Sequence, residues 1–258
     1  MPKITLEIPI FSPSSASTAL AHGATRLELN APSSYHSGGL TPPISTLSAL
    51  PSSVAVPLRI MIRPRGPPPV PEHDFLYSAE ELDVMVESIR AFKASGLLDA
   101  ERGDGFVFGV LRRGKTADDE LLSVDAEANA RLVREARPFG CTFHRAFDLV
   151  LATGTSVEEG VEDLLACGFD GVLTSGGPGD AVDNLQVFQR LIEAVDGRLD
   201  VLVGGGVRAA NASALLEATR AGERVWLHSS CIGQPGTDEV DEKEVTSLVQ
   251  AMKVTTSS

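Results

Sequence analysis

The residues of this chain that could take part in chemistry are charged, amide and histidine side chains that interrupt short apolar stretches. In an extended stretch, successive side chains point to opposite sides. The polar groups therefore share one side of each stretch, and the large apolar residues occupy the other. Those expected on that side are Thr5, Glu7, Arg26, Glu28, Asn30, Arg59, Met61, Arg63, Thr142, His144 and His228. Because buried charges are costly unless paired, the set forms either an internal ion-pair network or a small-molecule site.

Acid–base chemistry is one possibility, and its candidate residues are Glu7, Glu28, His144 and Asp148. Histidine exchanges a proton near neutral pH, and a neighbouring carboxylate can orient it or exchange a second proton. His144 opens the densest polar cluster of the chain. In that cluster Asp148 could either orient His144 or form a local ion pair with Arg145.

Anion binding is a second possibility. Glycine-rich loops let backbone N–H groups approach a negative charge, and a helix that begins after the loop adds a favourable dipole. The candidates are Arg63, Arg65, Arg145, Thr174, Ser175, Gly204, Gly205, Gly206, His228 and Ser229. The expected partner is a small molecule that carries a phosphate or a carboxylate.

The cysteines suggest a weaker third possibility. Cys231 follows His228 by three residues, and a His/Cys pair could hold a soft ion such as Cu(I). The alternative is an ordinary loop cysteine. Cys141, Cys167 and Cys231 are far apart and form no CxxC motif, which argues for a reducing compartment and against a structural zinc site.

These side chains must be positioned by strands, and eight strand-then-helix units are visible. The expected strands are residues 4–10, 26–30, 56–63, 104–111, 140–145, 170–175, 199–204 and 224–229. The expected helices are residues 14–22, 43–50, 79–95, 125–137, 155–167, 181–196, 208–221 and 240–252.

Eight such units in 258 residues predict a single-domain (β/α)8 TIM barrel over 1–254, with a frayed tail at 255–258. The alternative, a doubly wound sheet, normally has a glycine-rich loop after its first strand, and here that turn contains no glycine. In a barrel, the site is expected at the C-terminal mouth, and the loops after the last two strands are a frequent phosphate site.

Composition excludes several partner classes. Lys and Arg number 22 against 35 Asp and Glu, which gives a net charge of −13 and argues against nucleic acid, whose phosphates attract basic surfaces. No apolar run approaches the roughly 18 residues of a membrane span. No signal peptide is expected ahead of the first strand. We therefore expect neither a nucleic-acid nor a membrane partner.

The sequence also resembles the CutC family, whose motifs recur in order from residue 4 to about 230. The matching stretches are 26–29, 38–42, 61–66, 106–109, 142–148, 173–177, 204–207 and 228–230. The resemblance implies a (β/α)8 barrel, a cytoplasmic setting that extends to the nucleus in eukaryotes, and a homo-oligomer, a dimer or a tetramer. It also implies a role in copper homeostasis, with copper binding.

The chain departs from the family pattern at two positions. Family members commonly carry a cysteine in the first strand and another at the end of the second, and this chain has Pro9 and Asn30 there. The usual thiols are therefore missing, and Cys231 is the expected substitute at the mouth. Extra residues at 67–71 and 112–122 follow strands and are expected to narrow or cover the site.

Three functional hypotheses follow from the sequence. The chain could be a CutC-like copper homeostasis protein with an anion-binding pocket. It could be an enzyme that uses acid–base chemistry on a small phosphorylated or carboxylate metabolite. It could also be a non-catalytic, ligand-binding oligomer whose polar interior is structural.

Overall fold

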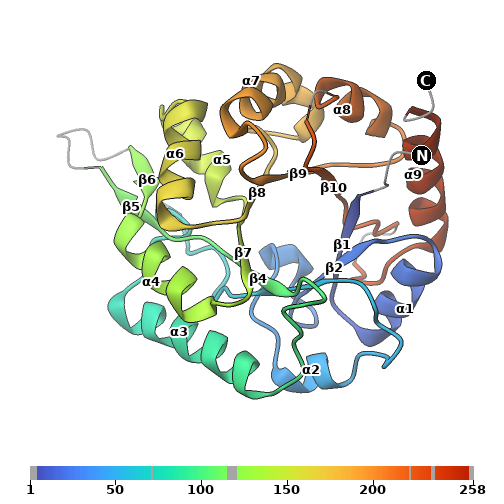
Figure 1. Cartoon of the computed structure of the whole chain (residues 1–258), viewed down its shortest axis with the longest axis horizontal. Helices are drawn as coiled ribbons and strands as arrows, with labels where there is room; N and C mark the ends of the chain where they lie inside the picture. Colours follow the sequence, from blue (N-terminus) through green and yellow to red (C-terminus); the bar gives the residue numbers. More distant parts are fainter. Residues whose placement is uncertain (1–4, 71, 115–120, 221, 234–235, 256–258) are drawn as a thin grey trace.

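Eight parallel strands form a closed barrel, shown end-on in Figure 1. The structure is a computed structural model that describes residues 5–70, 72–114, 121–220, 222–233 and 236–255. The barrel strands are β1 Leu6–Ile10, β2 Arg26–Leu29, β3 Leu58–Met61, β4 Gly105–Phe108, β7 Gly140–Phe143, β8 Gly171–Thr174, β9 Asp200–Gly204 and β10 Val225–His228. Their order around the barrel is β1-β10-β9-β8-β7-β4-β3-β2, which confirms the predicted TIM barrel and excludes the doubly wound sheet.

Helices surround the barrel on the outside (Figure 1). They are α1 Pro13–Ala21, α2 Ile44–Ser48, α3 Ala79–Ala94, α4 Ala126–Ala136, α5 Ala146–Ala152, α6 Val157–Cys167, α7 Leu185–Val195, α8 Ala212–Ala218 and α9 Glu242–Thr255, with short 3-10 turns η1 Tyr35–Ser37 and η2 Ala181–Asn184. Each of the eight expected helices has a counterpart, and α5 is additional. Among the described residues, none of the helices combines the length and the apolar character that crossing a membrane requires.

The predicted alternation along the strands is confirmed. Leu6 and Ile8 are fully buried in the apolar core, whereas Glu7, between them, contacts polar residues of the neighbouring strands. Arg26 on β2 and His228 on β10 are both in register with Glu7. Three polar side chains from three adjacent strands therefore meet inside the barrel.

Two segments differ from expectation. The insertion expected as a mouth loop at 112–122 instead forms a hairpin of β5 Leu111–Arg113 and β6 Leu122–Val124, of which residues 115–120 lie outside the described residues. Thr153 at the end of α5 exchanges hydrogen bonds with the backbone of Leu122, so the hairpin packs beside α5. The described residues of the hairpin do not line the cavity at the C-terminal ends of the barrel strands, whereas Pro67 of the other insertion does.

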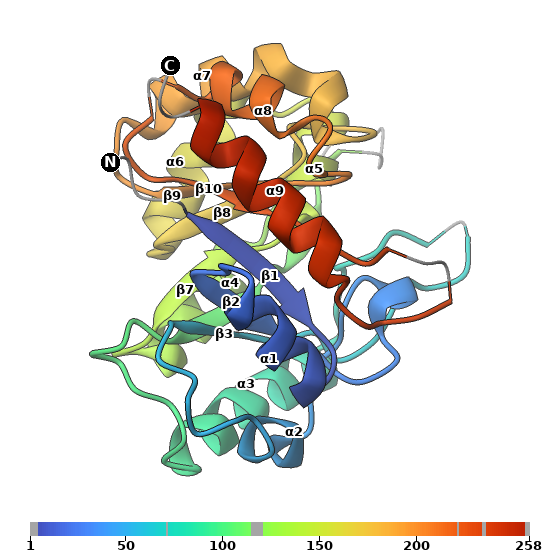
Figure 2. The ribbon, with the colours of Figure 1, turned by 90° about the vertical axis from the view of Figure 1, so that its right-hand side faces the viewer.

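Of the expected tail at 255–258, only the first residue is described. Thr255 is the last residue of α9, and its hydroxyl donates to Ser213 Oγ on α8 at 2.9 Å. Residues 256–258 lie outside the described residues. Figure 2 shows α9 running along the outside of the barrel beside β1 and α1, where the first and last strands meet.

Candidate functional site

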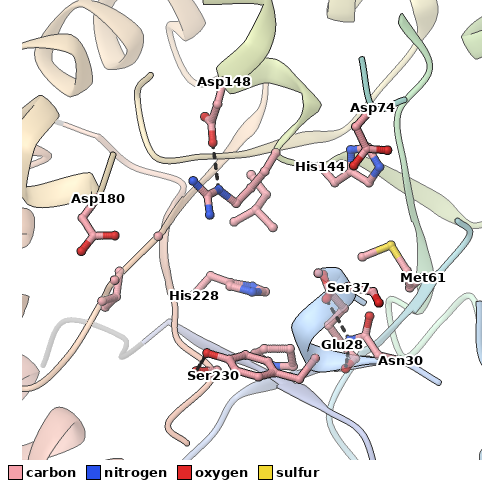
Figure 3. A pocket seen from close by; sticks show the side chains of 18 of the residues that line it. Glu28, Asn30, Ser37, Met61, Asp74, His144, Asp148, Asp180, His228 and Ser230 are labelled. Atoms are coloured by element: carbon pink, nitrogen blue, oxygen red, sulfur yellow. Dashed lines mark hydrogen bonds and ion pairs between the residues drawn. The ribbon is translucent and has the colours of Figure 1, made fainter. Parts of the chain in front are cut away.

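A cavity of about 820 Å³ opens at the C-terminal ends of the strands. Its walls come from residues that end or directly follow β2, β3, β7, β9 and β10, which is where the sequence placed the site. Figure 3 shows Glu28, Asn30, His144, Asp148 and His228 around this cavity. We call it the mouth pocket.

Glu7 lies at the base of the site and is fully buried. Its Oε2 accepts from Arg26 Nε at 2.5 Å, and its Oε1 lies 2.7 Å from His228 Nδ1. Burial would raise the pKa of Glu7, but the charge of Arg26 and the hydrogen bond with His228 outweigh it and lower that pKa. Both oxygens have partners and the residue does not line the mouth pocket, so the link between Glu7 and the pocket is the His228 ring.

His228 connects this buried pair to the cavity, and its ring points into the mouth pocket (Figure 3). Burial alone would lower its pKa, but the hydrogen bond with Glu7 and the charges of Glu28 and Glu7 together raise it. With Nδ1 donating to Glu7, Nε2 is the atom left for a ligand, and no described residue forms a hydrogen bond with it.

Glu28 is the second carboxyl group beside this histidine and is 3% exposed. Asn30 Nδ2 donates to its Oε1 at 3.0 Å, and Oε2 has no partner among the described residues. Burial and the charge of Glu7 raise the pKa of Glu28, although His228 and Asn30 oppose them. Neighbouring carboxyl groups with pKa values shifted in opposite directions are typical of acid–base sites.

His144 does not have the geometry of a general base. Its Nδ1 accepts the backbone N–H of Ala146 at 3.3 Å, and burial together with the charge of Arg63 lowers its pKa to about 3. The ring is therefore neutral at physiological pH with its proton on Nε2. That N–H is buried and has no partner among the described residues, so His144 offers a hydrogen-bond donor.

Asp148 pairs with Arg145 and does not orient His144. Its carboxylate accepts from Arg145 Nε at 2.8 Å, from Thr174 Oγ1 at 2.5 Å and from the backbone N–H and hydroxyl of Ser175, both at 2.9 Å. These contacts hold the loop after β8 in place. Of the two alternatives for Asp148, the structure shows the ion pair with Arg145, and Thr174 and Ser175 are bonded to the same carboxylate.

The two predicted arginines after β3 differ. Arg63 lines the mouth pocket, pairs with Asp74 at 2.6 Å and leaves its buried Nε without a partner among the described residues. Arg65 instead pairs with Glu81 of α3 at 2.6 Å and does not line the pocket. The expectation that Arg65 binds the anion is therefore not supported by its position.

The glycine loop after β9 contributes backbone donors. Gly205 and Gly206 line the mouth pocket with φ values of +106° and +66°, a region that favours glycine. In the described part of the chain, the N–H groups of Gly205, Gly206 and Val207 have no hydrogen-bond partner. The Asp180 carboxylate lies so close that a Cβ on Gly206 would be 2.4 Å from its Oδ2. Gly204 ends β9 and does not line the pocket.

Arg208 is a lining residue that the sequence analysis missed. Its Nη1 donates to Val207 O at 2.8 Å and lies 3.4 Å from Ser229 Oγ, and it forms no ion pair with any described residue. Ser229 in turn donates to Val207 O at 2.7 Å and so fastens the loop after β9 to the end of β10. Arg208 was overlooked because it was assigned to the following helix. The available signal was its position two residues after the three glycines, with Val207 between them.

The cysteines do not form a metal site at the mouth. Cys231 is fully buried in the apolar core, its thiol is 3.5 Å from Ser229 Oγ, and it does not line the pocket. Burial raises the pKa of the Cys231 thiol to about 11 and that of Cys141 to about 12, which disfavours the thiolate that copper needs. The expected His228–Cys231 pair is therefore absent from the described site.

The positions where the resemblance placed family thiols do face the mouth pocket. Pro9 and Asn30 both line it, but proline offers no ligand atom and the amide is hydrogen-bonded to Glu28. Among the described residues, Glu7, Glu28 and His228 alone have metal-like spacing. Two of these three donors are hard carboxylates and none is a thiolate or thioether, the ligands that select Cu(I). The residues present therefore do not fit a thiolate copper site.

Comparison with known proteins identifies the family. A model of the CutC family matches residues 4–233. The chain belongs to the CutC family. The human copper homeostasis protein cutC homolog is 39% identical over 218 residues, which cover 84% of this chain and 71% of the human protein. A CutC family protein of Sinorhizobium medicae is 36% identical over 239 residues, or 92% and 86% of the two chains.

Solved structures agree on the fold of this CutC family member. The crystal structure of CutC from Streptococcus agalactiae superimposes with a TM-score of 0.70 at 23% identity and covers 88% of this chain and 99% of that one. At this identity the similarity supports the barrel alone.

Proposed function

We propose that this CutC family protein binds a small anionic metabolite in the mouth pocket and transfers protons to or from it. The observation that carries the proposal is the position of His228. Its Nδ1 is held by the buried Glu7 carboxylate, while Nε2 faces the cavity beside a loop with unpaired backbone N–H groups. A carboxylate behind a histidine fixes the ring and stabilises its charged form, as acid–base catalysis requires.

The anion would bind at the loop after β9. Free N–H groups of Gly205, Gly206 and Val207 attract a negative charge, and Arg208 adds a cation without a carboxylate partner in the described site. Asp180 opposes this, because its carboxylate lies against Gly206. An anion must therefore displace the Asp180 side chain to reach all three donors.

The experiment separates binding from proton transfer. Calorimetry with inorganic phosphate should show saturable binding that Arg208→Gln weakens by about tenfold, as expected for a charge-assisted contact. In D₂O, the protein should catalyse the exchange of a C–H hydrogen of small phosphorylated carbonyl compounds for deuterium. Proton NMR measures this exchange. His228→Gln should slow that exchange by about 10²- to 10⁴-fold while phosphate still binds.

A matched control is available on the surface. His22 contacts Glu242 at 3.7 Å, so it is also a histidine beside a carboxylate, but it lies far from the mouth pocket. His22→Gln should change neither phosphate binding nor exchange. Phosphate binding without exchange in the wild-type protein would instead favour the non-catalytic, ligand-binding interpretation, and equal exchange in wild type and His228→Gln would refute the role of His228.

Copper homeostasis is a second candidate function, because it is the name of the human relative. An anaerobic Cu(I) competition titration of the reduced protein against a chelator tests it, with Cys231→Ser alongside. The buried thiols predict no binding above that of the chelator. Stoichiometric binding that the variant loses would show that Cys231 becomes accessible to copper.

A further inference from the structure

Two buried N–H donors on one wall of the mouth pocket have no partner in the described structure. They are Nε of Arg63, which follows β3, and Nε2 of His144, which follows β7. The two side chains are 3% and 4% exposed. Both side chains lie against the same residue, Phe75, and both line the mouth pocket. An unpaired buried donor costs about 1–3 kcal/mol, so two on one wall call for an explanation.

The Phe75 side chain packs against both of these residues. Its ring centroid lies 4.5 Å from that of His144, and the Arg63 guanidinium carbon lies 5.0 Å from the Phe75 ring centre. Phe75 also lines the mouth pocket. The Phe75 ring therefore packs against both side chains at the pocket wall, where both donor nitrogens are buried.

The backbone of Phe75 is strained. Its φ is +64°, a value that non-glycine residues rarely adopt. The conformation is held from both sides: the Phe75 N–H donates to Asp74 Oδ1 at 2.8 Å, and its carbonyl accepts from Leu111 at 2.9 Å. Such strain persists where the surroundings enforce it and is concentrated at ligand sites.

We propose that Arg63 and His144 form a second subsite, which binds a carboxylate or carbonyl oxygen of the ligand once the Phe75 ring moves aside. This rests on the proposed function, because the loop after β9 supplies the other subsite. The ligand class becomes a molecule with two electronegative ends, a phosphate near Arg208 and a carboxyl or carbonyl group near His144. The acidic group bound at this wall is Asp74, which pairs with Arg63.

The probes are phosphonoacetate, 3-phosphonopropionate and 4-phosphonobutyrate, which join the two kinds of anion by chains of increasing length. One of them should bind at least about tenfold more tightly than inorganic phosphate, because it satisfies both sets of donors. His144→Phe removes the Nε2 donor and keeps a ring, so it should abolish that preference and leave phosphate affinity unchanged. His36→Phe is the control, since His36 lines the same pocket without an orphaned buried nitrogen.

A second measurement needs no variant. In protein labelled with ¹⁵N-histidine, the Nε2–H signal of His144 should shift when the preferred probe is added and stay in place with phosphate alone. If phosphate binds but no probe binds more tightly and the signal does not move, the second subsite is refuted and the proposed function survives. If phosphate itself does not bind, the proposed function fails first.

Discussion

At the residue scale, most charges in the mouth pocket are partnered by other charges of the protein. Arg63 pairs with Asp74 and Arg145 with Asp148, so residue type alone overstated how many cations face a ligand. The donors left for a ligand include the His228 Nε2, the N–H groups of the glycine loop, and the unpartnered nitrogens of Arg63 and His144. The Arg208 guanidinium, whose described partners are neutral oxygens, adds a positive charge.

Asp180 is expected to limit anion affinity. Asp180→Asn removes the like charge beside Gly206 and keeps the side-chain shape, so phosphate should bind about three- to tenfold more tightly. Calorimetry at low ionic strength measures this. Asp183→Asn is the control, since Asp183 lies in the 3-10 turn that Asp180 caps and does not line the pocket. Weaker binding to Asp180→Asn would mean that Asp180 helps to hold the ligand.

The Glu7–His228 pair predicts a pH dependence of stability. Since the folded-state pKa of His228 is raised, its contribution is fully present below the unfolded value of about 6.5 and is lost as pH rises through the folded pKa. The Tm difference between wild type and His228→Gln should therefore be largest below about pH 6.5 and shrink at higher pH. Differential scanning fluorimetry from acidic to alkaline buffers tests this. A difference that grows with pH would contradict the raised pKa.

The sequence predicted the residues of the site better than their roles. Strand alternation placed Glu7, Glu28 and His228 correctly inside the barrel, because period-two patterning depends only on neighbouring residues. It could not tell that Asp148 would accept four hydrogen bonds, or that Cys231 would point into the core. Those outcomes depend on side-chain direction after a strand ends, where the alternation no longer applies.

At the element scale, helix starts and strand ends were predictable and insertions were not. Ser78 begins α3 with a capping box to Glu81, a local pattern of four residues. The hairpin β5–β6 pairs two segments across an insertion, and α5 follows β7 so closely that its first turn resembled a polar loop. Both depend on tertiary contacts that residue spacing does not reveal.

The packing of α5 on α6 gives a test of close approach between elements. Gly160 lies within α6, and a Cβ there would be 2.7 Å from Phe147 Cε2 of α5. Glycine to alanine in a helix normally stabilises by about 1 kcal/mol, but here overpacking should cost about 1–3 kcal/mol. Urea unfolding of Gly160→Ala measures the change, and adding Phe147→Leu should restore part of the loss. A more stable Gly160→Ala would show that α5 shifts freely.

At the scale of the whole molecule, the barrel closes where β1 lies between β2 and β10, and Glu7 bonds to both neighbours. The closed barrel was predictable from eight repeated units and chain length. The energetic role of this buried charge was not predictable. From sequence alone, a buried carboxylate fits both an internal ion-pair network and a small-molecule site, and only its partners distinguish the two.

Glu7→Gln should destabilise the entire fold. It leaves Arg26 buried with only Asp200 at 3.4 Å as a carboxylate partner, and breaking a buried ion pair typically costs about 3–5 kcal/mol. Chemical denaturation followed by circular dichroism measures it. Glu242→Gln, an exposed carboxylate beside His22, should change stability by less than about 0.5 kcal/mol. Equal effects of the two variants would show that the buried Glu7–Arg26 pair contributes no more to stability than an exposed carboxylate does.

The separation of Glu7 from its partners along the chain has a consequence for synthesis. Arg26 follows Glu7 by 19 residues, so the two charges can neutralise each other early, whereas His228 follows by 221. At about 5–20 residues per second, the ribosome delivers His228 roughly 10–40 s later. Through that interval β1 of the nascent chain has no β10 to pair with, so the barrel stays open. His228 lies on β10, so the partner of Glu7 arrives with the strand that closes the barrel.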